Sequence, residues 1–224
     1  IRAAVGDVPI VEDAAQSQGA RRNGEPTGTL GVLAATSFYP GKNLGAYGDA
    51  GAVLTSDPEL ATAVRLLGEH GSPRKYEHTV IGFNSRMDAL QAVVLSTKLR
   101  RLDEWNAQRR AAADRYAALL SDVDGVVAPV TAEGNEHVWH LYVVRVADRD
   151  RVLADLHAGG IGAGIHYPTP VHLTGAFAGL GHPEGAFPTS ETLAGEILSL
   201  PLFPGITEAQ QERVVEVLAK AVAQ

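Results

Sequence analysis

The chain contains no cysteine, and this absence removes several kinds of chemistry at once. Without thiols there is no disulfide, no thiolate metal site and no cysteine nucleophile, and cysteine usage says nothing about the redox compartment. No apolar run approaches the roughly 18 residues that a membrane span needs. Because hydrophobic residues still make up 45% of the chain, beside 24 glycines, the composition predicts a soluble, ordered and turn-rich protein.

Positive charge is also scarce: 19 lysines and arginines stand against 26 acidic residues, for a net charge of −7. Nothing gathers the positive charge into a basic patch, which argues against a nucleic-acid or membrane-surface binder. The only methionine is Met87, so no initiator precedes Ile1 in these 224 residues. We therefore expect the chain to be a piece of a longer protein.

The first part of the chain reads as a layered α/β domain. Asp57 and Pro58 are typical of a helix N-terminus, with Asp57 as the cap. Buried strands are expected in three short apolar runs, at residues 8–12, 32–39 and 51–55. Alternation of strands and loops before the chain turns helical favours a layered α/β domain.

The second part of the chain follows a long helical stretch, residues 87–120, in which we expect a break near residues 100–103. We place a domain boundary there, with a large domain at 1–100 and a smaller α+β domain at 101–224. Thr207 and Gln210 fit a capping box that begins the last helix. The other elements expected here are strands at 138–146 and 161–165 and a helix at 151–156.

Lys42 is the most informative residue, because it follows an apolar strand in a glycine-bracketed loop where a solvated charge is out of place. A desolvated lysine can lose its proton and act as a nucleophile, whereas an arginine cannot. An ordinary surface lysine remains the alternative on these grounds. A phosphate-binding P-loop is excluded, since Thr36 and Asn43 occupy positions that would require glycine and Ser or Thr.

Asp13 ends the first apolar run, 42 − 13 = 29 residues before Lys42. A pyridine ring that serves as an electron sink needs a protonated nitrogen, and a buried carboxylate beside that nitrogen keeps the proton there. A lysine together with such an aspartate is what pyridoxal phosphate (PLP) requires. Taken alone, Asp13 also fits a helix N-cap for the residues after Ala14.

Five blocks, in order along nearly the whole chain, resemble the DegT/DnrJ/StrS family of nucleotide-sugar aminotransferases, which use PLP on the fold-type-I architecture. The blocks are Val11–Ser17, Ser37–Gly45, Tyr47–Asp49, Gly82–Asp88 and Ile165–Pro168. The resemblance implies a fold-type-I α/β protein with a mixed sheet in a partial large domain, which lacks its N-terminal part, and a smaller C-terminal α+β domain. That part normally covers one face of the cofactor, so we expect the chain as it stands to be inactive.

The resemblance also implies roles for individual residues. Lys42 forms the covalent Schiff base with the cofactor, and a lysine at this position favours transamination over dehydration of the sugar. Asp13 pairs with the ring nitrogen, Gln16 lies near the ring and Ser37 binds the phosphate. Asn84 reaches the phosphate in the partner subunit, which implies a homodimer with composite active sites.

The substrate side is implied at Tyr39, Lys75, Arg86 and His166. Residue-level alternatives stay open, since Lys75 fits a solvated loop and Arg86 fits an ion pair with Asp88. Ser37 also fits a strand-end hydroxyl that bonds the backbone, Asn84 fits a turn residue after Gly82, and His166 fits ordinary loop packing. No metal site is expected, because His166 and His172 lie six apart across two prolines without a third partner.

The resemblance thus predicts a cytoplasmic aminotransferase of amino- or deoxysugar biosynthesis, including antibiotic pathways. It takes an amino group from glutamate or glutamine and gives it to a nucleotide-linked keto-sugar. Two alternatives remain: the same chemistry on a keto-cyclitol or related antibiotic precursor, and a regulatory protein that binds PLP or a sugar nucleotide without turnover. Intact Asp13, Gln16, Ser37 and Lys42 count against the regulatory alternative.

Overall fold

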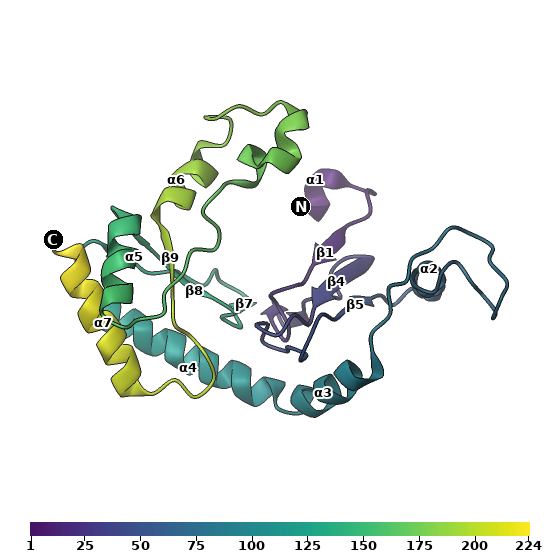
Figure 1. Cartoon of the computed structure of the whole chain (residues 1–224), viewed down its shortest axis with the longest axis horizontal. Helices are drawn as coiled ribbons and strands as arrows, with labels where there is room; N and C mark the ends of the chain where they lie inside the picture. Colours follow the sequence, from purple (N-terminus) through teal and green to yellow (C-terminus); the bar gives the residue numbers. More distant parts are fainter. The chain divides into compact units, whose positions relative to one another are not determined.

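The long helical stretch divides into α3 (Ala89–Leu99) and α4 (Leu102–Leu120), which confirms the expected break. The computed structural model describes all residues, 1–224, and forms two units (Figure 1). Unit 1 comprises residues 1–107 and 131–140, and unit 2 comprises 108–130 and 141–224. The domain boundary expected at residue 100 stays a prediction.

Unit 1 is built on a mixed three-stranded sheet in the order β1-β4-β5 (Figure 1). Its strands are β1 (Val11–Asp13), β4 (Leu33–Ser37) and β5 (Gly51–Leu54). β1 runs parallel to β4, with Asp13 opposite Ala35, and β5 runs antiparallel to β4. The three expected strands are therefore confirmed, although each is shorter than its apolar run.

The expectation that the first strand is buried is wrong for this chain. Val11 is 62% exposed, and Asp13 is exposed as well. The physical reason is that β1 forms one edge of the sheet, so only β4 pairs with it. Within unit 1 the clearest core lies elsewhere, where Leu44 and Ala46 pack with Leu95 and Leu102.

Apart from α2 (Pro58–Gly68), the remaining elements of unit 1 are short. Asp57 caps α2 as expected, accepting hydrogen bonds from the backbone N–H groups of Glu59 and Leu60. The other elements are α1 (Arg2–Val5) and a three-stranded ribbon of β3 (Glu25–Pro26), β2 (Arg21–Arg22) and β7 (Asn135–Glu136).

Unit 2 has an antiparallel sheet in the order β6-β8-β9, formed by β6 (Val126–Val127), β8 (Tyr142–Val146) and β9 (Ile197–Leu200). Helices α5 (Arg149–Ala158) and α7 (Glu208–Val222) lie side by side (Figure 1). The expected capping box at Thr207 and Gln210 is confirmed. α6 (Pro188–Glu196) and two 3-10 turns, Val171–Leu173 and Gly175–Leu180, complete the unit.

Two strand predictions in unit 2 need correction. The strand expected at 138–146 begins only at Tyr142, because Trp139 has a φ of 47°, which breaks the extended backbone. The strand expected at 161–165 does not form, and Gly164 makes only an isolated bridge with Ser199. Glycine loses the most conformational entropy on ordering and offers no side chain to pack, which weakens this segment as a strand.

Glu12 fixes the long connection between β1 and β4. Its carboxylate accepts hydrogen bonds from the backbone N–H groups of Gly28, Leu30 and Gly31, at 2.9, 2.6 and 2.7 Å. Burial opposes ionisation of Glu12, but these three donors outweigh it and hold its pKa below the ordinary value. The ionised carboxylate therefore stabilises the connection that allows β1 and β4 to pair in parallel.

Replacing Glu12 with glutamine (Glu12→Gln) is expected to lower the free energy of unfolding by about 2 kcal/mol at neutral pH, because an amide oxygen is a weaker acceptor than a carboxylate. Since the folded-state pKa lies below 4.5, this contribution is complete above that pH and is lost as the pH falls through the folded-state value. Urea unfolding of both proteins from neutral pH to about pH 3 measures the difference. A difference that stays constant with pH contradicts the prediction.

Candidate active site

Two predicted site residues end neighbouring parallel strands. Asp13 is the last residue of β1 and Ser37 is the last residue of β4. Just beyond Asp13, the N–H of Ala14 donates to the carbonyl of Ala35 at 2.8 Å, which keeps the two strand ends together. Ligands of α/β sheets commonly bind at the carboxyl ends of strands, so the carboxyl ends of β1 and β4 form the candidate site.

Asp13 places a carboxylate at the carboxyl end of β1, and much of its capacity to accept hydrogen bonds is unused. One oxygen accepts the N–H of Ala15 at 3.1 Å, and the other has no partner within the chain. The segment after Asp13 forms a turn and not a helix, so the N-cap alternative is wrong. The carboxylate is exposed, not buried as expected, because β1 lies at the edge of its sheet.

Lys42 lies on a closed loop directly after β4. The N–H of Lys42 donates to the Tyr39 carbonyl at 2.9 Å, and the N–H of Ala46 donates to the Phe38 carbonyl at 2.7 Å. The side chain of Lys42 is half-buried, and its Nζ makes no hydrogen bond or ion pair in the chain. An amine that no carboxylate engages is available for reaction with a carbonyl compound.

Helix α3 holds this loop from the other side. Lys98 Nζ donates to the Gly45 carbonyl at 2.7 Å and lies 4.6 Å from the centre of the Tyr47 ring. Gln91 Oε1 accepts the N–H of Tyr47 at 2.8 Å. Sequence reasoning missed both side chains. Their seven-residue spacing places them on one face of a helix, but that spacing does not reveal which loop they contact.

Ser37, Gln16 and Tyr39 are placed around the same strand end. Ser37 Oγ accepts the N–H of Tyr39 at 3.2 Å, which leaves its hydroxyl proton available for a ligand. Gln16 is exposed, and Tyr39 is 58% exposed. The structure thus places a carboxylate and a hydroxyl at the ends of two paired strands, and a free amine on the loop that follows β4.

Asn84 and Arg86 contact each other. Arg86 Nε donates to Asn84 Oδ1 at 3.1 Å, so the alternative pairing of Arg86 with Asp88 is wrong. Arg86 and Lys75 line one hollow of about 470 Å³. Two histidines, His70 and His78, line it as well, together with Arg74 and the carboxylate-bearing Glu69. Because cationic and imidazole groups outnumber the single carboxylate, the hollow suits an anionic group such as a phosphate.

His166 belongs to unit 2. Its Nδ1 lies 2.8 Å from Ser199 Oγ, and its ring meets the Tyr167 ring edge-on at 5.6 Å. His172 instead pairs with Glu191, at 2.9 Å between Nε2 and Oε1. No group of three or more carboxylates and imidazoles that could hold a metal ion is present. None of the helices combines the length and apolar character required to cross a membrane.

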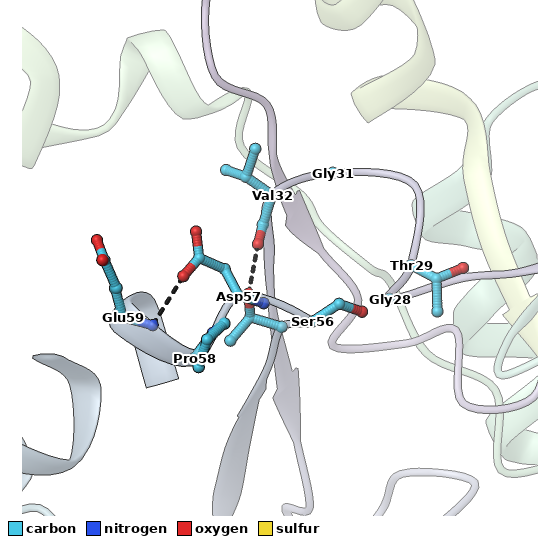
Figure 2. A pocket seen from close by; sticks show the side chains of 9 residues that line it. Gly28, Thr29, Gly31, Val32, Ser56, Asp57, Pro58 and Glu59 are labelled. Carbon is cyan, nitrogen blue, oxygen red and sulfur yellow. Dashed lines mark hydrogen bonds between the residues drawn. The ribbon is translucent and has the colours of Figure 1, made fainter. Parts of the chain in front are cut away.

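A second hollow, of about 600 Å³, lies between the 28–32 loop and the start of α2 (Figure 2). Two of its polar side chains are already engaged, because Asp57 accepts the N–H of Glu59 and Thr55 donates to the Val32 carbonyl. The hollow lies at the amino end of β4, whereas Ser37 lies at its carboxyl end. It is therefore not the candidate active site.

The mixed sheet, with Asp13 and Ser37 at the carboxyl ends of its parallel strands and Lys42 on the loop after β4, fits the fold-type-I class of aminotransferases. Residues 3–219 match the DegT/DnrJ/EryC1/StrS aminotransferase family, and the chain belongs to that family. The resemblance predicted from the five sequence blocks is therefore confirmed, together with the fold class.

Individual relatives agree with this assignment. The chain is 50% identical to the erythromycin biosynthesis sensory transduction protein EryC1 of Saccharopolyspora erythraea, over 93% of this chain and 57% of that protein. It is 49% identical to dTDP-3-amino-3,4,6-trideoxy-alpha-D-glucose transaminase of Streptomyces venezuelae, over 92% of this chain and 55% of that enzyme. The crystal structure of S. venezuelae DesV in complex with a ketimine intermediate matches with a TM-score of 0.94 and 46% identity, over 99% of this chain and 60% of that one. The chain thus spans less than two thirds of each.

Gly45 tests how strictly the loop geometry is required. A Cβ at this position would lie 2.3 Å from the Pro40 carbonyl oxygen, so Gly45→Ala forces the backbone around Lys42 to shift. We expect a loss of about 2 kcal/mol in the free energy of unfolding, measured by thermal denaturation. Gly195→Ala is the control, since a Cβ there meets nothing within 4 Å. Equal stability of the two variants contradicts the prediction.

Proposed function

We propose that the whole protein is a PLP-dependent aminotransferase that transfers an amino group from glutamate or glutamine to a nucleotide-linked keto-sugar. The observation that carries this proposal is the unpaired amine of Lys42, on a loop that follows β4, whose end lies beside Asp13. The family assignment and the transaminase from Streptomyces venezuelae support it. The donor releases its amino group and becomes a keto acid, while the ketone of the sugar becomes an amine.

The residues present fit PLP by the chemistry of their donor set. Bound PLP supplies an electron sink that stabilises the carbon from which a proton is removed. Asp13 holds a proton on the pyridine nitrogen with its unpartnered oxygen. Ser37 donates its free hydroxyl proton to the phosphate, and Gln16 binds near the ring. Lys42 holds the cofactor covalently through Nζ, and Nζ then moves the proton at the substrate carbon.

The hollow lined by Lys75 and Arg86 is proposed to receive the diphosphate of the sugar nucleotide. A lysine provides a point charge and an arginine provides a planar fork of donors, and both complement phosphate oxygens. Tyr39 and His166 are proposed to contact the sugar nucleotide. The protein works in the cytoplasm, where such metabolites are made and consumed.

A homodimer with composite active sites forms part of the proposal. Leu90 and Val93 on α3 are 79% and 65% exposed, and Phe83 beside Asn84 is 69% exposed. Clustered exposed apolar side chains mark surfaces that bind proteins. In the proposed dimer, Asn84 reaches the cofactor phosphate of the partner subunit. A second copy of the chain suits this surface because α3 also supports the Lys42 loop.

A regulatory protein without turnover is the second candidate, favoured by one observation: the EryC1 relative is named a sensory transduction protein. Such a protein binds the cofactor or a sugar nucleotide but does not exchange an amino group. Mixing the PLP-loaded protein with glutamate or glutamine and following the cofactor absorbance distinguishes the two candidates. Conversion to the amine form of the cofactor supports the enzyme, and a stable complex without exchange supports the regulator.

Lys42→Ala is expected to abolish both covalent PLP capture and transamination, because no other side chain supplies the amine. Borohydride reduction of the PLP-loaded whole protein, followed by peptide mass analysis, is expected to find the pyridoxyl group on Lys42 only. Lys220→Ala is the matched control, since Lys220 pairs with Glu216 on α7 and is expected to leave activity unchanged. A pyridoxyl adduct on another lysine, or full activity of Lys42→Ala, would overturn the proposal.

A further inference from the structure

A chain of buried side-chain amides begins at Asn43, the residue after Lys42. Asn43 Nδ2 donates to Asn106 Oδ1 at 3.0 Å, and Asn106 Nδ2 donates to the backbone carbonyl of Gln18 at 2.9 Å. Asn43, Asn106 and Gln18 are 6%, 2% and 9% exposed. All three belong to unit 1, and none lies near another in the sequence.

The orientation of the Asn43 amide is fully determined. Its Nδ2 also donates to the Val138 carbonyl at 2.8 Å, so both amide hydrogens are used. Its Oδ1 lies 3.2 Å from His140 Nδ1, which therefore carries the proton and donates it. The bonds run in one direction, from His140 through Asn43 and Asn106 to the Gln18 carbonyl. Hydrogen bonds aligned in this way reinforce one another in a low-dielectric interior.

Gln18 connects this chain of amides to the ends of β1 and β4, where Asp13 and Ser37 lie. Its Nε2 donates to the Ala15 carbonyl at 3.1 Å and to the Ser37 carbonyl at 2.7 Å. It also lies 3.0 Å from Thr36 Oγ1, which itself donates to the Ala14 carbonyl at 3.1 Å. One side chain thus holds the segment after Asp13 and the end of β4 at a fixed separation.

Gly19 leaves the room that Asn106 needs. Its φ is +87°, and a Cβ there would lie 2.6 Å from Asn106 Nδ2. Any other residue would be strained in this conformation and would displace the Asn106 amide. The backbone around Gln18 is therefore shaped to admit this one buried amide.

We propose that Asn43, Asn106 and Gln18 are positioning residues that set the Lys42 amine relative to the Asp13 carboxylate and the Ser37 hydroxyl. The inference rests on the proposed function, since it assigns these residues to the capture of PLP by Lys42. Hydrophobic packing of Leu44 and Ala46 holds the loop on the core but is not directional. Hydrogen bonds are directional, and they tie the backbone at residue 43 to both strand ends.

The test compares two buried amides in the PLP-loaded whole protein. Asn106→Leu breaks the amide chain, whereas Gln211→Leu removes an amide of unit 2 that is 0% exposed and bonds Ala112 and Arg115. Covalent capture of PLP is followed by absorbance and by borohydride labelling of Lys42. Hydrogen exchange of the cofactor-free protein reports the backbone at residues 38–46. We expect Asn106→Leu to weaken capture about tenfold and to speed this exchange, since small displacements of reacting groups are costly, and Gln211→Leu to do neither.

The outcomes separate the inference from the proposed function. If the unaltered protein shows no adduct on Lys42, the proposed function fails, whereas the exchange experiment still tests the positioning of the loop. If the unaltered protein captures PLP and Asn106→Leu matches Gln211→Leu in both measurements, the inference is overturned.

A second pair of variants covers the case in which Asn106→Leu does not fold. His140 is only half-buried, at the outer end of the amide chain. His140→Leu removes the donor to Asn43, and His140→Gln supplies an amide N–H in its place. We expect His140→Leu to weaken covalent capture of PLP and to speed exchange at residues 38–46, because Asn43 loses one of its hydrogen bonds, and His140→Gln to restore both. If all three proteins capture PLP equally and exchange at the same rate, the inference is overturned.

Discussion

The parallel pairing of β1 with β4 is the constraint on which the candidate site depends. Parallel strands need a crossover connection, usually a helix. Here the connection contains no helix but only the β2–β3 part of the ribbon, and its return to β4 is fixed by the Glu12 carboxylate. If this pairing slipped by one residue, Asp13 would turn to the other face of the sheet. The ionised carboxylate of Glu12 therefore determines the position of the neighbouring Asp13, the candidate partner of the pyridine nitrogen.

The chemistry-bearing residues could be predicted from the sequence because each lies beside a local signal. Lys42 follows an apolar run and is bracketed by glycines, and Asp13 ends another run. The break between α3 and α4 and the capping box at Thr207 are likewise local, and both were predicted correctly. The strand expected at 161–165 failed because its apolar pattern ignored what two glycines cost an ordered segment.

The supporting residues could not be predicted, because their partners are set by tertiary packing. Asn43 and Asn106 are separated by 63 positions, and Asn43 and His140 by 97. An isolated asparagine has no sequence signature that distinguishes a buried connector from a turn residue. The exposure of Asp13 was missed for a related reason, since a short apolar run does not reveal whether its strand lies at the edge or in the middle of a sheet.

Two lysines of unit 1 show how the structure separates support from chemistry. Lys98 is fully engaged, with its ammonium on the Gly45 carbonyl and against the Tyr47 ring. Lys42 has no such contact. The loop that carries it is held by the close approach of the Gly45 backbone to the Pro40 carbonyl, by the packing of Leu44 in the core and by the hydrogen bond from Lys98. The fold therefore gains no hydrogen bond or ion pair from the Lys42 side chain. Because this half-buried amine makes neither kind of contact, it remains free for a reaction. The difference between an engaged Lys98 and a free Lys42 favours a catalyst over a regulator that only binds.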